Sequence, residues 1–306
     1  MASDGWQQDL ARLLPAARLD EPLKNHTTFC IGGPADAYLE ARSLDDLKKL
    51  YGFCVPRGVP VFLLGWGSNL LVLDGGIRGV VLALRGEFES LSFDGCRARA
   101  GAGVRLPALA VECGKRGLSG AEPLVGVPGT VGGSLVMNAG TRDGEIGALV
   151  REVEIFDPSA LQTRVLARAE LAFDYRKSNL GGRVVTGGLL ELKAGDKVDI
   201  LGRIKDFQSR RLKTQPIHTF NVGSIFKNPP GRFVAKLIED AGLKGRSRGG
   251  ARVSPLHANF IENERSATAA DVLALIDEVR EAVRARFGVD LELEVKVVGE
   301  AAPRPA

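Results

Sequence analysis

The chain has 306 residues, of which 44% are hydrophobic and a quarter are charged, so it can bury a core and is not a disordered chain. Its net charge of +4 is small for this length and its basic and acidic residues are interleaved, which disfavours nucleic acid as a partner and suits an anionic small molecule. Four cysteines without a CxxC pair and three histidines without an HExxH motif argue against a disulfide framework and a metal site.

The N-terminus has no targeting signal that we can identify. Residues 1–4 are acidic rather than basic and no apolar core follows them, so no signal peptide is expected. No apolar run approaches the ~18 residues that cross a bilayer. We therefore expect a reduced, cytoplasmic protein without a membrane span, whose residues 1–20 form an N-terminal extension with a helix.

Strands, helices and glycine-rich turns alternate in the first third of the chain. Residues 43–54 predict an amphipathic helix, because Ser43 and Asp46 have capping-box spacing and apolar residues follow every three or four positions. Short buried strands are expected at residues 60–64, 70–73 and 79–84. The class is therefore mixed α and β.

The rest of the chain continues this mixture. Strands are predicted at residues 151–156 and 183–193, and helices at 106–116, 130–139, 197–212 and 232–241. Residues 268–287 give the clearest helix, with apolar residues on one face and Thr268 and Asp271 as a capping pair. A final strand with clean alternation is expected at residues 291–298.

The glycines do not follow the common nucleotide-binding motifs. Gly65-x-Gly67-x-x-Leu70 and Gly101-x-Gly103-x-x-Leu106 each have leucine where the dinucleotide fingerprint has its third glycine, and GxxxxGK[ST] is absent. A Rossmann or P-loop protein is therefore disfavoured.

A different segment, residues 126–140, combines Pro128 with closely spaced glycines. Successive backbone N–H groups here can face one anion, as in the nests that bind pyrophosphate. The alternative is a structural turn followed by a tightly packed helix. Ser68 and Asn69 add short polar groups to the earlier glycine turn.

Several segments, taken in order, resemble the UDP-N-acetylenolpyruvoylglucosamine reductase family, also called UDP-N-acetylmuramate dehydrogenases. They cover nearly the whole chain and are residues 25–36, 64–72, 126–133, 173–178, 223–229, 237–242, 257–261 and 293–296. The short stretch between Arg176 and Ser224 resembles the compact type of the family, which lacks a tyrosine-loop insertion.

The resemblance implies an α+β fold, with a two-lobed FAD-binding fold of the vanillyl-alcohol-oxidase type and a C-terminal α+β substrate domain. Residues 21–76 would form the first FAD-binding lobe and residues 77–200 the second. Residues 201–294 would form the substrate-binding domain, and the last strand, within 295–306, would return to the second lobe.

The resemblance also implies bound FAD and NADPH as a co-substrate. We expect FAD to be noncovalent, since no histidine or cysteine near the flavin loops predicts attachment. The residues matched to flavin contacts lie in the two glycine segments: Gly65, Gly67, Ser68, Asn69, Leu70, Gly126, Pro128, Gly129, Thr130, Gly132, Gly133, Asn138, Ala139 and Gly140.

The implied reaction reduces UDP-N-acetylglucosamine enolpyruvate to UDP-N-acetylmuramate for peptidoglycan, and so serves cell-wall biogenesis, cell shape and cell division. Arg176 matches the catalytic arginine, whose guanidinium can stabilise charge that develops on a carboxylate. Ser224 matches the proton donor. Glu294 matches the catalytic glutamate, although strand alternation puts Glu292 on the same face and spacing alone does not choose between them.

The substrate-binding candidates are Tyr175, Lys213, Lys227, Asn228 and Asn259. The basic segment Lys244–Arg252 is interpreted as a mobile loop near the substrate diphosphate. Two other functions stay open at this point. One is a flavin enzyme of the same superfamily that oxidises an alcohol with oxygen, and the other is a catalytically silent flavin or nucleotide-sugar sensor.

Overall fold

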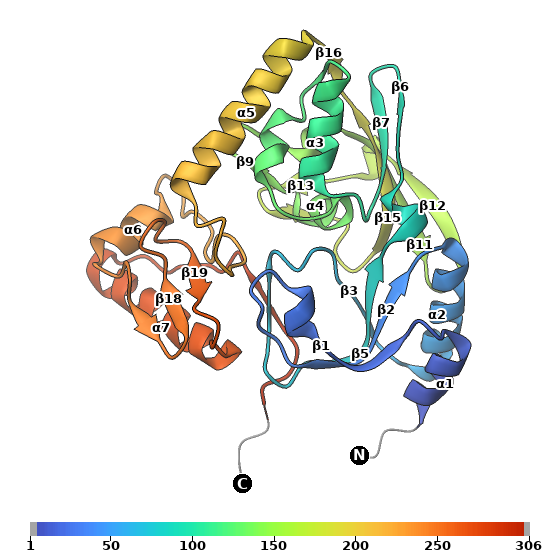
Figure 1. Cartoon of the computed structure of the whole chain (residues 1–306), viewed down its shortest axis with the longest axis horizontal. Helices are drawn as coiled ribbons and strands as arrows, with labels where there is room; N and C mark the ends of the chain where they lie inside the picture. Colours follow the sequence, from blue (N-terminus) through green and yellow to red (C-terminus); the bar gives the residue numbers. More distant parts are fainter. Residues whose placement is uncertain (1–4, 303–306) are drawn as a thin grey trace. The chain divides into compact units, whose positions relative to one another are not determined.

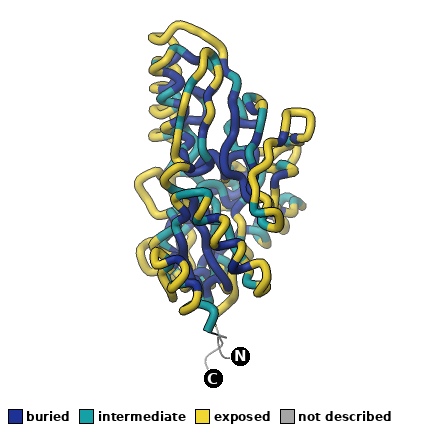
Figure 2. The backbone as a smooth tube through the Cα atoms, turned by 90° about the vertical axis from the view of Figure 1, so that its right-hand side faces the viewer, coloured by how far each residue is buried: buried dark blue, intermediate teal, exposed yellow. Residues whose placement is uncertain are grey.

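A computed structural model describes residues 5–302 and divides the chain into two compact units. Unit 1 comprises Met1–Leu19, Ala37–Trp66 and Gly79–Arg210, and unit 2 comprises Asp20–Asp36, Gly67–Arg78 and Arg211–Ala306. Each unit is therefore assembled from segments that are far apart in the sequence. In Figure 2 the buried backbone runs through the strands and the inner faces of helices, while the connecting turns are exposed.

The centre of unit 1 is a five-stranded antiparallel sheet with strand order β12-β11-β15-β7-β6 (Figure 1). The strands are β6 (Leu91–Asp94), β7 (Arg97–Gly101), β11 (Val150–Asp157), β12 (Gln162–Ala167) and β15 (Val184–Glu191). Every residue of β15 except the last is buried, as expected for a central strand that is covered on both faces.

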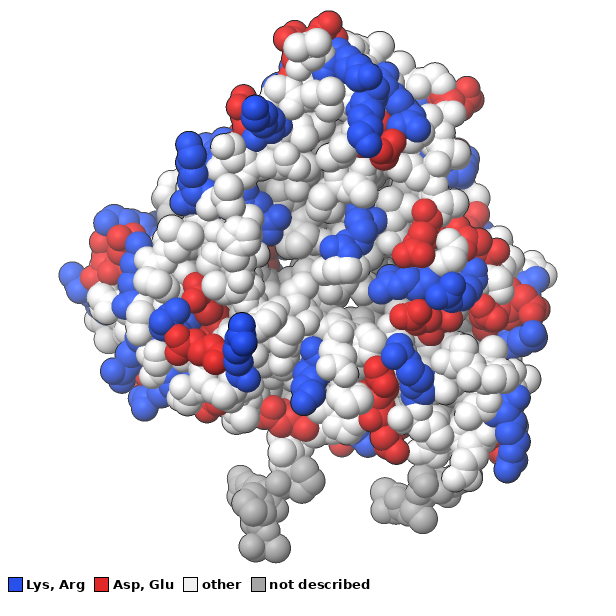
Figure 3. Space-filling model, in the orientation of Figure 1, with Lys and Arg blue, Asp and Glu red and all other residues white. Residues whose placement is uncertain are grey.

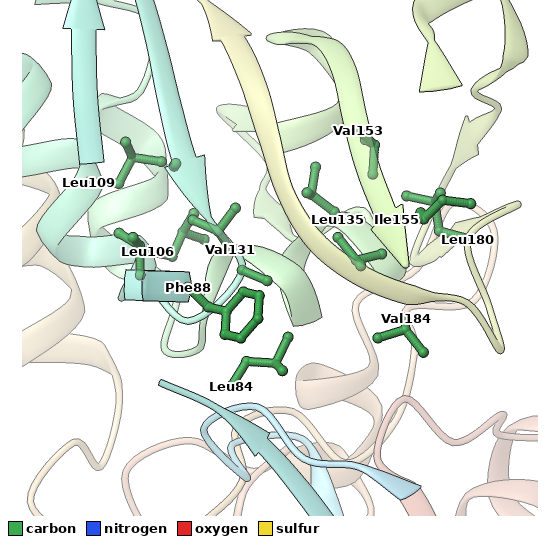
Figure 4. Packing of buried hydrophobic residues seen from close by; sticks show 14 of the residues in the cluster. Leu84, Phe88, Leu106, Leu109, Val131, Leu135, Val153, Ile155, Leu180 and Val184 are labelled. Carbon is green, nitrogen blue, oxygen red and sulfur yellow. The ribbon is translucent and has the colours of Figure 1, made fainter. Parts of the chain in front are cut away.

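Two short helices of unit 1 pack close to this sheet: α3 (Leu106–Lys115) and α4 (Val131–Met137). Figure 4 shows the apolar side chains that they contribute, such as Leu109 and Leu135, in one cluster with Val153 and Val184 of the sheet. The helix expected loosely at residues 130–139 is confirmed, as is the helix at 106–116.

A second sheet has the order β1-β2-β5-β3. Its strands are β1 (Arg18–Pro22), β2 (Pro34–Ala41), β3 (Val61–Leu63) and β5 (Ile77–Leu84), and β3 pairs parallel to β5. Helix α1 (Trp6–Leu13) and helix α2 (Leu44–Arg57) belong to unit 1, and the predicted capping box of Ser43 and Asp46 is present at the start of α2.

Short elements connect the sheets of unit 1. They are β8 (Leu118–Ser119), β9 (Gly140–Thr141), β10 (Gly144–Glu145), β13 (Phe173–Asp174), β14 (Lys177–Ser178) and β16 (Lys193–Ala194). The 3₁₀ helices η2 (Gly86–Glu89), η3 (Glu122–Gly126), η4 (Ile146–Ala148) and η5 (Arg168–Glu170) lie between them, and α5 (Lys197–Thr214) leads into unit 2.

Unit 2 is built on the long helix α7 (Ala269–Phe287), which begins at the predicted Thr268–Asp271 capping box. The buried face of α7 includes Val272, Ile276 and Val279. The other elements are η1 (Leu23–His26), β4 (Leu70–Val72), α6 (Val234–Asp240), β17 (Ser247–Arg248), β18 (Ala251–Val253), β19 (Ile261–Asn263) and β20 (Lys296–Val298).

The end of the chain differs from expectation in two ways. Only residues 296–298 of the predicted strand at 291–298 form a strand, because the apolar alternation before it buries Leu291 and Val295 in the core around α7 instead of pairing a ladder. The strand pairs parallel with β4, inside the segment expected to be the first lobe, and not with residues 77–200.

The basic segment Lys244–Arg252 is a hairpin and not a free loop. β17 pairs with β18, and the cations are in local ion pairs, with Lys244 against Glu239 and both Arg246 and Arg248 against Glu278. On the face drawn in Figure 3, basic and acidic side chains are likewise interspersed. Among residues 5–302, no helix is both long and apolar enough to cross a bilayer.

Glu122 of unit 1 is a buried carboxylate, 4% exposed. Its Oε1 accepts hydrogen bonds from Ser119 Oγ at 2.8 Å and from Arg203 Nη2 at 2.6 Å, and its Oε2 accepts one from the Gly120 N–H. Burial alone raises the pKa of this carboxyl, but these hydrogen bonds outweigh it and hold the pKa below its usual value. The interaction ties α5 to η3.

Replacing Arg203 by alanine should lower the free energy of unfolding by about 1–3 kcal/mol at neutral pH, because a buried carboxylate loses its charged donor. The depressed pKa contributes stability above the unfolded-state pKa of about 4.3, and this contribution is lost as the pH falls through the folded-state pKa. Urea titrations of the wild type and Arg203→Ala should therefore converge in acid. Arg164→Ala, which breaks the exposed pair with Glu170, is the matched control and should change little. A difference that persists unchanged in acid would exclude Glu122 as its cause.

Candidate active site

The start of helix α4 leaves part of the predicted phosphate cradle available in unit 1. The N–H groups of Val131 and Gly132 are already engaged, since they donate to the carbonyls of Val104 at 2.8 Å and Ala102 at 2.9 Å. The N–H groups of Gly129 and Thr130 donate to no other group among the residues that the structure describes. Gly129 has φ +144°, a conformation that favours glycine.

Arg105 adds a cationic group next to these amides. Its backbone forms an isolated β-bridge with Thr130, and its guanidinium lies over the ring of Trp66. Its Nε is buried without a hydrogen-bond partner in the described part of the chain. Burial, together with the charge of Arg85, lowers the pKa of Arg105 to about 10. A guanidinium with an unsatisfied Nε beside unused backbone N–H groups fits an anion such as the diphosphate of FAD.

Other glycines of the cradle are required by close packing. A Cβ on Gly132 would lie 2.8 Å from the Cβ of Ala102, and one on Gly140 would lie 2.4 Å from the carbonyl oxygen of Gly144. A Cβ on Gly65 would lie 2.9 Å from Thr130 Oγ1, so the first glycine turn and the start of α4 are neighbours. Close packing alone therefore explains why these positions are glycine, and their contact with a cofactor stays a prediction.

Arg176 lies at the tip of the hairpin formed by β13 and β14, with Tyr175 beside it. Its φ of +56° is uncommon for a residue with a side chain and costs roughly 1–2 kcal/mol. The Arg176 side chain is 17% exposed, with Nη1 3.8 Å from Glu145 Oε1. Tyr175 is exposed, and its ring faces the same guanidinium. Backbone strain of this kind clusters at functional sites.

The second part of the glycine turn, residues 67–70, belongs to unit 2. Gly67 has φ +64°, and a Cβ there would lie 2.3 Å from the carbonyl oxygen of His26. Ser68 follows, and Leu70 begins β4. Asn69 Nδ2 donates to the carbonyl of Glu294 at 3.2 Å, which brings a predicted flavin residue next to a predicted catalytic one.

Ser224 and Glu294 lie on neighbouring backbone segments of unit 2. The carbonyl of Ile225, directly after Ser224, accepts the Glu294 N–H at 2.8 Å, and Phe226 bridges to Leu293. The structure also separates the two glutamates that alternation had left equivalent. The side chain of Glu292 is 73% exposed and paired with Lys227, whereas Glu294 is partly buried.

The remaining substrate candidates differ in their surroundings. Asn259 is buried and its side chain binds the backbone of Phe226, with Oδ1 accepting the N–H at 3.0 Å and Nδ2 donating to the carbonyl at 2.8 Å. Asn228 Oδ1 accepts the Val234 N–H at the start of α6. Lys213 is exposed near the end of α5. Asn259 therefore holds the segment that carries Ser224.

Sequence reasoning missed Arg105 and Glu145. Glu145 faces Arg176 and accepts a hydrogen bond from Asn138 at 2.7 Å. Its position in β10, directly after the glycine segment, was the available signal. No sequence signal pointed to Arg105, because its candidate role depends on burial and on the backbone bridge to Thr130.

Two family models match the chain. An FAD binding domain matches residues 35–165, and the C-terminal domain of UDP-N-acetylenolpyruvoylglucosamine reductase matches residues 215–298. The FAD match covers all of the cradle residues described above. These observations define an FAD-binding oxidoreductase.

The UDP-N-acetylenolpyruvoylglucosamine reductase of Moorella thermoacetica is 47% identical to this chain, over 92% of the chain and 93% of that protein. Reductase 2 of Symbiobacterium thermophilum is 45% identical over 92% of both. The crystal structure of the enzyme from Thermus caldophilus is 40% identical, covers 92% of this chain and 97% of that one, and has a TM-score of 0.80. The chain belongs to the UDP-N-acetylenolpyruvoylglucosamine reductase family, and the expected fold class is confirmed.

Gly132→Ala should destabilise the protein by about 1–3 kcal/mol, because its new methyl group would overlap Ala102 and push α4 away from β7. Gly133→Ala in the same helix is the matched control. Its Cβ would meet only Thr130 Oγ1, at 3.7 Å, so the gain in helix propensity of about 1 kcal/mol should dominate. Urea unfolding of both variants measures the difference. Equal destabilisation would show that the tight contact at Gly132 is not what requires glycine there.

Proposed function

We propose that this chain uses NADPH and FAD to reduce UDP-N-acetylglucosamine enolpyruvate to UDP-N-acetylmuramate, a precursor of peptidoglycan. The observation that carries the proposal is the pairing of the Ser224 and Glu294 segments through Ile225. It joins two residues that the family motifs single out at distant positions in the last segment of unit 2, Arg211–Ala306. Arg176, the third, is present on a strained turn of unit 1.

Arg176 would bind the carboxylate of the enolpyruvyl group. FAD, when bound, supplies the hydride that reduces the enolpyruvyl double bond. A guanidinium can hold a carboxylate through two parallel hydrogen bonds, and these strengthen as negative charge spreads into that group. The strained turn fixes where the guanidinium can reach, so part of the ordering cost is met during folding.

Ser224 would donate the proton to the carbon next to the carboxylate, and Glu294 would act on the same part of the substrate. A serine is a weak acid, so the role depends on position. Here Asn259 and residues 293–295 hold the backbone that follows Ser224 through several hydrogen bonds. These contacts support a rigid proton donor.

The other assignments are part of the same proposal. Gly129, Thr130 and Arg105 would bind the FAD diphosphate noncovalently, with residues 65–70 also at the flavin. Tyr175, Lys213, Lys227 and Asn228 would contact the substrate, and Asn259 would act through Phe226. The partners would be small molecules and not nucleic acid or membrane. The reaction would take place in the cytoplasm, where NADPH is available, and would support cell shape and division through peptidoglycan supply.

The purified protein should carry the absorption bands of oxidised flavin, and NADPH should bleach them without oxygen. Adding UDP-N-acetylglucosamine enolpyruvate should restore them, because the reduced flavin then passes its hydride to the substrate. Anaerobic spectrophotometry measures both steps. Bleaching that only oxygen reverses would instead indicate an oxidase of the same superfamily, and a protein that cannot bind FAD would contradict the proposal.

Glu294→Gln should lower kcat by about 10²–10⁴-fold if Glu294 takes part in acid–base chemistry. Glu292→Gln, two positions earlier on the exposed side, is the matched control and should leave kcat within about twofold. Steady-state kinetics on FAD-loaded protein measure both variants. The reverse order of effects would move the catalytic role to Glu292.

A further inference from the structure

Asn138 ends helix α4, and sequence reasoning assigned it to flavin binding. The residue is 2% exposed and has a left-handed φ of +45°. Its Oδ1 accepts the Gly147 N–H at 3.0 Å, and its Nδ2 donates to Glu145 Oε2 at 2.7 Å and to the Asp174 carbonyl at 3.0 Å. Both donor hydrogens and the oxygen of the amide are therefore bonded to protein groups.

These three bonds connect Asn138 to both sides of Arg176. Asp174 is the last residue of β13 and directly precedes the Tyr175–Arg176 turn, so the bond to its carbonyl fixes the backbone from which the turn starts. Glu145 uses its other oxygen, Oε1, to face the guanidinium of Arg176. One amide thus holds the base of the hairpin and the carboxylate opposite its tip.

The side-chain amide of Asn138 is also closely packed by its neighbours. A Cβ on Gly147 would lie 2.6 Å from both Asn138 Oδ1 and Phe173 Cγ, so the amide is packed between η4 and β13. A second bond ties the hairpin to α4, from Ser178 Oγ to the Val136 carbonyl at 2.8 Å. That bond touches neither Glu145 nor the residue before the turn.

Glu145 orients Arg176 by charge. The 3.8 Å between Nη1 and Oε1 is longer than a direct hydrogen bond. The direction of the Glu145 carboxylate is set by its 2.7 Å bond from Asn138.

We propose that Asn138 is a positioning residue for Arg176, acting through the Asp174 carbonyl and the Glu145 carboxylate. The inference rests on the proposed function, in which Arg176 binds the substrate carboxylate. Removing the amide lets the hairpin and its counter-charge shift, and a displacement of about 1 Å at a catalytic group costs on the order of 10²-fold in rate.

The test is a double-mutant cycle between Asn138 and Arg176 in the FAD-loaded full chain. Asn138→Gly keeps the left-handed backbone accessible and removes all three bonds. Asn138→Asp keeps the shape but cannot donate, and it remains informative if the glycine variant does not fold. Each is combined with Arg176→Lys. The rate measured is the single-turnover reoxidation of reduced enzyme by UDP-N-acetylglucosamine enolpyruvate.

We expect each Asn138 variant to slow this step by about 10–100-fold with Arg176 present, and by under about twofold in the Arg176→Lys background. Ser178→Ala, which removes the other tie to α4, is the matched control. It should lower the melting temperature without slowing the step comparably.

Equal slowing by the Asn138 variants in both backgrounds would overturn the inference, because Asn138 would then act independently of Arg176. Unchanged reoxidation in both Asn138 variants would also overturn it while leaving the proposed function intact. Failure of the wild type to be reoxidised by this substrate would overturn the proposed function, and the inference with it.

Discussion

The close approach of helix α4 to strand β7 is the constraint on which the rest of unit 1 depends. Gly132 leaves no space for a side chain, and the N–H groups at the helix start bind the backbone that follows β7. This fixes a seven-residue helix that would be too short to be stable alone. Once it is fixed, the Gly129 and Thr130 amides directly before it are held in place, and Asn138, which caps its C-terminus, reaches the Arg176 hairpin.

In unit 2, too, the side chain of a buried asparagine fixes the backbone next to a candidate residue. Asn259 is buried like Asn138, and its amide binds one backbone segment through both a donor and an acceptor. The segment that it holds carries Ser224 and lies against residues 293–295. In both units, the neutral side chain of a buried asparagine fixes the backbone beside a candidate catalytic residue. A neutral amide can do this at any pH, and it adds no charge that would compete for an anionic substrate.

Most helices could be predicted from the sequence because their signals are local. The capping boxes before α2 and α7 and the apolar spacing that follows need no knowledge of tertiary contacts. Strands β6, β7 and β12 were not predicted, since none of them has a continuous apolar run like those at residues 60–64 and 79–84, and β12 is almost entirely exposed. Polar and apolar residues do alternate at residues 291–298. The apolar ones before residue 296 are buried in the core around α7, however, and only residues 296–298 form a strand.

For the candidate site, the sequence could name residues but not the contacts that they make. Family motifs singled out Arg176, Ser224 and Glu294, while spacing could not distinguish Glu294 from Glu292. In the structure the two differ, since Glu292 is exposed and paired with Lys227 while Glu294 is partly buried, and the catalytic role of Glu294 stays a prediction. Likewise, no sequence pattern shows whether an asparagine in a glycine-rich segment binds a ligand or a neighbouring backbone, because its partners come from tertiary structure.

The number of charged residues, likewise, says less than their burial and their ion pairs. The chain has 41 lysines and arginines, but the basic hairpin at residues 244–252 shows how readily they are matched by nearby carboxylates. Exposed pairs of this kind add little field at a distance, because water and salt screen them. Burial marks out Arg105 and Arg211, whose pKa values it lowers, and Arg176 is largely shielded on its hairpin. A desolvated guanidinium binds an anion more strongly than an exposed one. In the proposed function, anion recognition would therefore depend on a few shielded arginines and on the Gly129 and Thr130 amides, and the small net charge is no measure of it.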